Sequence, residues 1–240
     1  MQVVPGIDIL DGKCVSPVHR SYGLDSAHSE DPAEVASLWA SEGAERLWIA
    51  DIDGARSGEL RNMDVLRSII DAVDIPIDFG GGIRSLATAE KMFDMGVDRV
   101  VIGTVAALDI DTTKDIFESI GDRTVLATGS MGGYVALHDW QARTDEKIGD
   151  FIKRMADMGA KHIAYADVAR KGMHGGLNIY GIKRLASSVD VPIIVSGGVN
   201  SLDCLRDLKE IEDCGIEGVV TVTALYSGAI DLGEAIKICK

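Results

Sequence analysis

Two glycine-rich turns with the same neighbours stand out in this sequence of 240 residues. Residues 73–86 contain Phe79-Gly-Gly-Gly-Ile-Arg-Ser-Leu86, and residues 189–202 repeat the pattern at an offset of 116 residues (189 less 73). Each copy predicts a short apolar strand, a glycine turn and a helix that begins at Ser85 or Ser201. Glycines let a backbone approach a ligand closely, and a helix start offers unpaired N–H groups and a positive dipole end. This is phosphate-binding chemistry, and two copies predict a ligand with two phosphates; the alternative is that the glycines only serve tight turns.

Acidic residues follow three of the apolar stretches. Asp8, Asp51 and Asp167 each stand at the C-terminal end of a predicted strand. Partial burial after a strand would raise the pKa of Asp8, which suits a general base. The alternative for Asp8 is a carboxylate that caps nearby N–H groups.

The other two aspartates have basic neighbours in the sequence. Arg56 lies close enough to Asp51 to pair with it, so a structural role is the better interpretation there. Arg170 and Lys171 follow Asp167 and could hold it ionised. Three histidines, His19, His138 and His174, fall in predicted loops or strand ends, where histidines are usually only solvated.

The elements that must position these residues alternate between strands and helices along the chain. Strands are expected at residues 3–9, 46–51, 75–79, 99–102, 123–128, 162–166, 192–195 and 218–221. Helices are expected at residues 32–42, 62–72, 87–95, 112–120, 146–158, 179–187, 202–211 and 232–238. Eight such pairs, with apolar strands suited to burial on both faces, predict a (β/α)8 TIM barrel within the α/β class. A doubly wound open sheet is the alternative, but it does not explain the internal repeat.

The repeat extends beyond the glycine turns. Ala50-Asp51 matches Ala166-Asp167, and residues 96–104 match residues 215–223. The sequence therefore predicts a duplicated half-barrel, with residues 1–240 forming one domain. The stretch from Leu10 to about Asp31 is long for a connection in such a fold, which favours a functional lid.

Composition restricts the partners. The 46% hydrophobic content suits a packed core, and the net charge of −14 argues against nucleic acid or an anionic membrane as a partner. No apolar run approaches the ~18 residues of a membrane span, and no signal peptide is recognisable, so the cytoplasm is the expected location. The four cysteines match no metal or redox motif, so no metal is expected.

Six motifs follow one another along the chain: Val4-Pro-Gly-Ile-Asp-Ile-Leu-Asp-Gly-Lys13, Phe79-Gly-Gly-Gly-Ile-Arg-Ser-Leu86, Val101-Ile-Gly-Thr104, Tyr165-Ala-Asp167, Ser196-Gly-Gly-Val199 and Ala224-Leu-Tyr226. Together and in this order they resemble the HisA branch of the histidine-biosynthesis isomerases, whose sister is the HisF cyclase. The resemblance covers essentially the whole chain. It implies a cofactor-free Amadori rearrangement of a ribotide, a small substrate that carries a phosphate at each end. The rearrangement converts an aminoaldose into an aminoketose. Oligomeric state stays open, with a monomer slightly favoured.

The resemblance also implies roles for single residues. Asp8 matches the family's general base. Asp167 is the candidate acid of this chain because it stands on a neighbouring strand end and could serve in place of the family's second aspartate. The expected phosphate and substrate contacts are Gly81, Gly82, Arg84, Gly103, Thr104, Gly172, Gly197, Gly198 and Thr223.

The chain departs from the family pattern at positions that would face the substrate. Where the family has a second catalytic aspartate, after the fifth strand, this chain has Gly129. The glycine-lysine pair usual after the eighth strand is Val222-Thr223, and the loop after the sixth strand reads Arg170-Lys-Gly-Met-His-Gly-Gly-Leu177. The first loop has Ser16, Arg20 and Ser21 in place of an arginine and a glycine-aspartate pair.

Three hypotheses follow. The first is the ribotide isomerase, the second is a diverged paralogue acting on another phosphorylated sugar or nucleotide, and the third is a barrel that binds a phosphorylated ligand or a protein without catalysis. The intact Asp8, Asp51 and Asp167 favour the first two, while Gly129 and Val222 favour the last two.

Overall fold

The computed structural model describes residues 1–15, 31–137, 142–167 and 177–240, and of Asp167 it describes the backbone. Within this part of the chain, eight parallel strands pair in a ring, and the pairing of the fourth with the fifth closes a barrel. The (β/α)8 prediction is therefore confirmed. In chain order the barrel strands are β1 (Gln2–Leu10), β3 (Leu47–Asp51), β4 (Ile77–Gly80), β5 (Arg99–Ile102), β6 (Thr124–Met131), β9 (His162–Asp167), β10 (Ile193–Ser196) and β11 (Ile216–Thr221).

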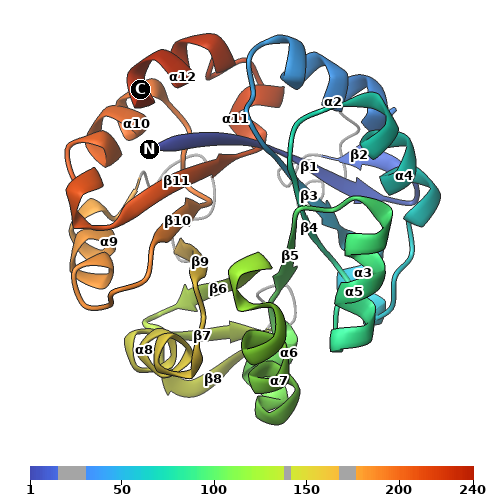
Figure 1. The fold of residues 1–240 in the computed structure, drawn as a ribbon. Coiled ribbons are helices and arrows are strands. Elements are labelled where there is room, and N and C mark those ends of the chain that lie inside the picture. Colours follow the sequence, from blue (N-terminus) through green and yellow to red (C-terminus); the bar gives the residue numbers. More distant parts are fainter. Residues whose placement is uncertain (16–30, 138–141, 168–176) are drawn as a thin grey trace.

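Helices surround the strands (Figure 1). The main helices are α2 (Pro32–Ser41), α4 (Met63–Ala72), α5 (Leu86–Met95), α7 (Ile110–Ile120), α8 (Ile148–Met158), α9 (Ile179–Ala186), α10 (Leu202–Lys209) and α12 (Leu232–Cys239). Three short helices lie in the loops at the C-terminal ends of strands: α3 (Ile52–Ser57), α6 (Thr104–Leu108) and α11 (Thr223–Tyr226). Across the described residues, none of these helices combines the length and the apolar character that a membrane crossing requires.

The helix boundaries follow from local chemistry. Asp31 accepts a hydrogen bond from the Ala33 amide at the start of α2, Pro32 occupies the first turn, and Gly43 takes a φ of 98° beyond the end of the helix. Ser85 caps α5 through the Thr88 amide. Both helix starts agree with the sequence prediction.

The barrel interior is filled by one layer of apolar side chains drawn from almost every strand. Trp48 is the largest of them, and Val125 is fully buried. The layer consists of Val4, Trp48, Val101, Val125, Ala164, Ile194 and Val220. The alternate residues of each strand, such as Phe79 and Ile102, pack outward against the helices in a second and larger core. These two cores hold the strand ends at fixed positions.

The connection after β6 differs from the prediction. Residues 146 and 147 were expected to begin a helix, but they belong to strand β8 (Ala142–Lys147), which pairs with β7 (Tyr134–Leu137) as a hairpin that extends β6. Exposure alternates along β8, with Arg143, Asp145 and Lys147 exposed. This period of two is the pattern of a strand, and α8 begins only at Ile148.

The stretch expected as a lid begins with a further short strand. β2 (Lys13–Val15) pairs antiparallel with the end of β1, so that Asp8 lies opposite Val15. The rest of that stretch, residues 16–30, lies outside the described residues.

The internal repeat is visible in the backbone. Ser85 and Ser201, the caps of α5 and α10, have φ, ψ of −158°, 158° and −155°, 163°. Gly103 and Val222, which precede α6 and α11, have −133°, −90° and −122°, −78°. Equivalent turns of the two halves therefore share one conformation.

Candidate active site

Asp8 lies at the mouth of the barrel and points into it. A Cβ placed on Gly6 would lie 2.5 Å from Val222 Cγ2 and 3.5 Å from Val220 Cγ1, so Gly6 faces the interior. Strand side chains alternate, so Asp8 shares that face, two residues further toward the C-terminal end. The Asp8 side chain is buried, with 5% of the residue exposed. An acid at this place has the location expected of a catalytic group in such barrels.

Two strands of the barrel, β6 and β9, carry small side chains at the mouth. Ala127 and Ala164 pack on the interior layer, and strand alternation places Gly129 and Ala166 one step above them. The register pairs Gly129 with Ala166, and it pairs Asp167 with Ser130. The strand-five position that carries an acid in the family pattern therefore faces the mouth here with no side chain, and Asp167 stands one residue beyond that level.

Asp51 has a structural role, as predicted, but its partner is not Arg56. Its carboxylate is fully buried; Oδ1 accepts the Gly54 amide at 2.9 Å, and Oδ2 accepts the Arg61 and Asn62 amides at 3.2 and 3.1 Å. The Asn62 side-chain Nδ2 donates to Oδ1 at 2.7 Å. These four donors use the acceptor capacity of the carboxylate, so the hydrogen bonds of Asp51 hold the loop after β3 in one conformation.

The first glycine turn is packed against that loop. Gly81 and Gly82 have φ of 131° and 76°, in the region that favours glycine. A Cβ on Gly81 would lie 2.3 Å from the Asp51 carbonyl oxygen, and a Cβ on Gly82 would lie 2.3 Å from the Glu59 carbonyl oxygen. These two glycines are therefore required by backbone packing as well as being suited to a ligand.

The helices behind the two glycine turns are capped by their own serines. Ser85 accepts from the Thr88 amide at 3.1 Å and Ser201 from the Cys204 amide at 3.3 Å. In contrast, α6 and α11 begin at Thr104 and Thr223 without a side-chain cap. The amides at these two uncapped starts are the better candidates for holding an anion, and sequence reasoning did not separate them from the capped starts.

Gly103 and Val222 occupy equivalent places in the two halves of the barrel. Both positions have negative φ and nearly the same backbone conformation. Valine therefore adopts this turn without strain. What differs is the side chain at the mouth: Val222 packs beside Gly6, whereas Gly103 has no side chain, and a Cβ there would lie 3.4 Å from the Ala127 carbonyl oxygen.

Arg84 lies against the loop after β3. A Cβ on Gly58 would lie 2.3 Å from Arg84 Cζ, so the guanidinium packs directly on the Gly58 backbone. Arg84 itself is exposed, and it forms no salt bridge with any residue of the described ranges. A guanidinium held in this way at the C-terminal end of the barrel can receive a phosphate or carboxylate.

The second glycine turn also has the predicted backbone. Gly197 and Gly198 have φ of 77° and 79°. Gly172, Arg170, Lys171 and the histidines His19, His138 and His174 lie outside the described residues. In the part of the chain that the structure covers, no group of three or more His, Cys, Asp or Glu is arranged to hold a metal ion.

Behind Asp8, on the helix side of β1, lies a small buried polar group. Cys14 is 8% exposed, and its neighbours include Tyr226, whose ring meets that of Trp39 edge-on at 5.9 Å between centroids. Burial raises the pKa of the Cys14 thiol to about 12, against an opposing effect of its hydrogen bond with Tyr226. The same burial raises the pKa of Tyr226 far above its usual range, so both groups stay protonated at neutral pH.

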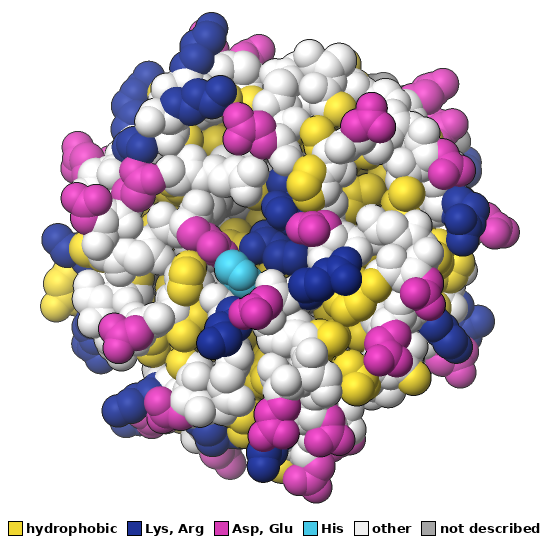
Figure 2. Space-filling model, viewed as in Figure 1, with side chains coloured by type: hydrophobic (Ala, Val, Ile, Leu, Met, Phe, Trp, Pro, Cys, Tyr) yellow, Lys and Arg dark blue, Asp and Glu magenta, His cyan; other side chains and the backbone are white. Residues whose placement is uncertain are grey.

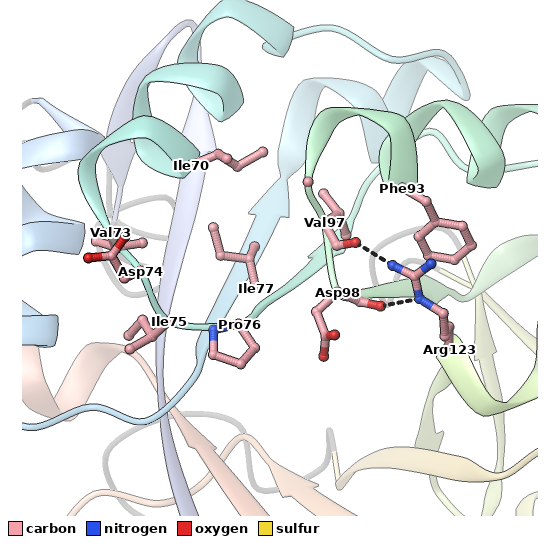
Figure 3. Close-up of a pocket in the computed structure, with 11 residues that line it drawn as sticks. Ile70, Val73, Asp74, Ile75, Pro76, Ile77, Phe93, Val97, Asp98 and Arg123 are labelled. Atoms are coloured by element: carbon pink, nitrogen blue, oxygen red, sulfur yellow. Dashed lines mark hydrogen bonds between the residues drawn. The ribbon is translucent and has the colours of Figure 1, made fainter.

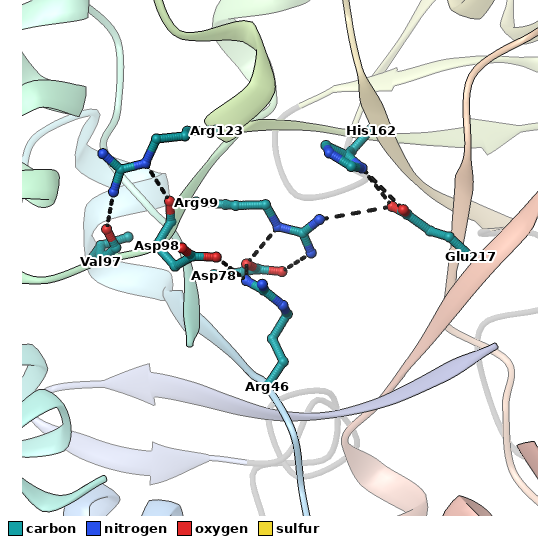
Figure 4. Close-up of polar contacts among 8 residues, drawn as sticks. All are labelled: Arg46, Asp78, Val97, Asp98, Arg99, Arg123, His162 and Glu217. Atoms are coloured by element: carbon teal, nitrogen blue, oxygen red, sulfur yellow. Dashed lines mark hydrogen bonds and ion pairs between the residues drawn. The ribbon is translucent and has the colours of Figure 1, made fainter. Parts of the chain in front are cut away.

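The opposite, N-terminal end of the barrel holds ion pairs that sequence reasoning missed (Figure 4). Asp78, 1% exposed, receives Arg46 Nη1 at 2.6 Å and Arg99 in a two-pronged contact at 2.9 and 2.6 Å. Burial lowers the pKa of Arg99, but its hydrogen bonds with Asp78 and the charge of Asp78 outweigh this effect and raise it. The signal in the sequence was an aspartate within the apolar stretch Ile75–Phe79.

The same end is completed by Glu217 and His162. His162 Nδ1 lies 2.9 Å from Glu217 Oε1, and Arg99 Nη1 lies 4.0 Å from that oxygen. Figure 2 shows basic, acidic and histidine side chains gathered at the centre of one face of the molecule. These residues form a charged layer at the N-terminal end of the barrel, in which Arg46 also donates to Asp98 at 2.7 Å.

A cavity of about 350 Å³ lies beside this end, between the last turns of α4 and α5 (Figure 3). Arg123 borders it, donating to the Val97 and Asp98 carbonyl oxygens at 2.8 and 2.9 Å, with its guanidinium 3.7 Å from the centre of the Phe93 ring. None of the predicted site residues lines this cavity, so it is separate from the candidate active site.

Comparisons with known proteins agree with this arrangement. A family model described as "Histidine biosynthesis protein" matches residues 2–231. A protein of Syntrophotalea carbinolica is 39% identical over 240 residues, which cover 100% of this chain and 99% of the relative. A protein of Gloeobacter violaceus is 38% identical over 237 residues, which cover 99% of this chain and 93% of the relative.

Both relatives carry the name 1-(5-phosphoribosyl)-5-((5-phosphoribosylamino)methylideneamino) imidazole-4-carboxamide isomerase, as does a relative from Trichlorobacter lovleyi that is 38% identical over 240 residues. The match with the Trichlorobacter lovleyi protein covers 100% of this chain and 98% of that relative. By the match along residues 2–231 and the similarity over its full length, this chain belongs to the histidine biosynthesis protein family.

Proposed function

We propose that this protein is an intramolecular isomerase that converts the aminoaldose of a doubly phosphorylated imidazole-carboxamide ribotide into the aminoketose. The names of its relatives give the substrate class. The observation that carries the proposal for this chain is Asp8, a buried carboxylate that faces the barrel mouth among small side chains. The reaction rearranges atoms within one molecule, so the chain's own acids and bases can carry it.

Asp8 acts as the general base in this proposal. An Amadori rearrangement requires an acid that protonates the ring oxygen as the sugar opens, and a base that removes the proton from the carbon next to the new imine. The enolaminol that forms takes up a proton at the former imine carbon and loses the hydroxyl proton of the adjacent carbon, which becomes the ketone. Asp167, at the end of β9, is the proposed acid, since Gly129 leaves strand five without one.

The two phosphates hold the substrate across the mouth. One is proposed to lie on the amides near Gly82 and the uncapped start of α6 at Gly103 and Thr104. The other is proposed to lie near Gly197 and Thr223, in the second half of the barrel. Arg84 supplies a charge beside the first, and Gly172 completes the expected set.

One observation favours a second candidate function. The strand-five position faces the mouth as Gly129, so the residue pattern for the ribotide is incomplete. A paralogue acting on another phosphorylated sugar would keep the phosphate turns and Asp8 while changing this position. A turnover assay with the ribotide decides between the two: formation of the ketose supports the isomerase, and binding of the ribotide without turnover supports the paralogue.

A further inference from the structure

The side chain of Asn62 makes unusual hydrogen bonds for a residue at a helix start. It is the N-cap residue of α4, where asparagine usually accepts a hydrogen bond from an amide of the first turn. Its side chain makes no such cap. Instead the two hydrogens of its Nδ2 go to two carboxylates, Asp51 Oδ1 at 2.7 Å and Asp53 Oδ2 at 2.9 Å.

The two aspartates contact different parts of the chain. Asp53 Oδ2 also accepts the Asp11 amide at 2.7 Å, which fixes the turn at the end of the Asp8-bearing strand. Asp11 has a φ of 50°, and among the described residues it is the one non-glycine residue with a positive φ. Asp51 contacts the first glycine turn through its backbone. A Cβ on Gly81 would lie 2.3 Å from the Asp51 carbonyl oxygen, so the turn packs directly against Asp51.

We infer that Asn62 is a positioning residue that couples the turn behind the catalytic base to the glycine turn of the first phosphate site. Its carboxamide is suited to this place because one nitrogen supplies both donors that two adjacent carboxylates require. An aspartate here would set a third negative charge beside the two, and an alanine would leave both with one donor fewer. Its catalytic part rests on the proposed isomerase function.

The test uses amide hydrogen exchange on the full chain, with steady-state kinetics on the same samples. Asn62→Ala is expected to speed exchange about tenfold at residues 9–13 and 80–84, the factor for one lost hydrogen bond to a charged group. Asn62→Asp is expected to do more, because it keeps the shape but adds repulsion. With the ribotide, KM is expected to rise about tenfold through the displaced phosphate turn.

Two further variants keep the test decisive. Asp53→Ala removes only the branch to Asp11, so faster exchange is expected at residues 9–13 and not at 80–84. Asp231→Ala removes the cap that accepts the Glu234 amide at 2.8 Å on α12, and it serves as the matched control with unchanged KM. If Asn62→Ala lowers the melting temperature but leaves exchange at residues 80–84 and KM as in Asp231→Ala, Asn62 is only structural and the inference is wrong. A parent protein that turns over no ribotide would refute the proposed function, while the exchange data would still decide the coupling.

Discussion

At the scale of single residues, Asp51 and Asp167 allow the roles of one repeated position to be compared between the two halves of the barrel. They are equivalent in the internal repeat, and each is the last residue of its strand. Asp51 has its carboxylate bound by loop amides and Asn62. Asp167 is proposed to act on the substrate, so the two halves are expected to respond differently to the same substitution.

Asp167→Asn is expected to lower kcat by about 10²–10⁴, the usual contribution of a general acid, with KM within a few-fold of the parent. Asp51→Asn is the matched variant, and it is expected to lower the melting temperature because an amide nitrogen would face the amides that Asp51 binds. Steady-state kinetics and thermal melts of both variants measure this. An Asp167→Asn protein that melts lower but keeps the parent kcat would show that Asp167 repeats the role of Asp51.

Cys14 gives a pH dependence with a definite sign. Burial raises its pKa from 9.0 to about 12 in the folded protein, so the folded state holds the thiol proton more tightly than the unfolded state. The resulting stability is fully present below pH 9 and is lost as the pH rises from 9 toward 12. Between pH 8 and pH 10 the parent is expected to lose about 1.4 kcal/mol more unfolding free energy than Cys14→Ala, as one pH unit beyond the unfolded pKa corresponds to that amount.

Urea unfolding at the two pH values measures this difference. The comparison with Cys14→Ala cancels the other groups that titrate in this range, among them Cys239, whose pKa is also raised by burial. Equal losses in parent and variant would mean that the Cys14 thiol ionises as easily in the folded state as in the unfolded one.

At the scale of elements, apolar runs and helix-start residues were sufficient for the barrel strands and most of the main helices. Ser85 and Ser201 marked helix starts correctly because each cap is a local interaction. The hairpin of β7 and β8 was missed because β7 is short and β8 carries exposed polar residues; β7 pairs with β6, and β8 pairs with β7. Asn62 was missed as well, since the sequence near it predicts only a helix start and its two acidic partners are brought to it by folding.

The two uncapped helix starts differ by one side chain, and a swap tests their roles. Inorganic phosphate is expected to bind the parent more tightly near Gly103–Thr104 than near Val222–Thr223, because Val222 occupies the mouth beside Gly6. Val222→Gly is expected to strengthen the second site, and Gly103→Val to weaken the first, each by about tenfold, the equivalent of one hydrogen bond.

Amide chemical shifts of residues 103–105 and 222–224 during a phosphate titration report the two sites separately. The shared backbone conformation of Gly103 and Val222 makes the swap free of backbone strain, so each variant serves as the control for the other. Equal affinity of both sites in the parent would overturn this explanation.

At the scale of the whole molecule, the two ends of the barrel have different tasks. The C-terminal end carries Asp8, the glycine turns and the uncapped helix starts. The N-terminal end carries the ion pairs of Asp78 and Arg99, which are the second and first residues of their strands. The family resemblance located the first set of residues, whereas the charged layer arises only when distant strands bring Arg46 and Arg99 to one carboxylate.

Asp78→Ala is expected to lower the unfolding free energy by about 3–5 kcal/mol, because it leaves two largely buried arginines without their shared partner. The KM for the ribotide is expected to stay at the parent value, since the substituted residue lies at the opposite end of the barrel. Denaturant unfolding and steady-state kinetics measure the two effects. A variant of parent stability, or one with altered KM, would contradict this division of tasks.

The central claim is that Asp8 removes a proton from a doubly phosphorylated ribotide bound at the barrel mouth. The most direct measurement is single-turnover conversion of the ribotide by the parent protein and by Asp8→Asn, with ribotide affinity measured in parallel. The amide keeps the shape of the carboxylate but cannot accept the proton, so the proposal predicts ketose formation by the parent, none detectable with Asp8→Asn, and nearly equal affinity for both. No ketose from the parent, or conversion by Asp8→Asn at the parent rate, would contradict it.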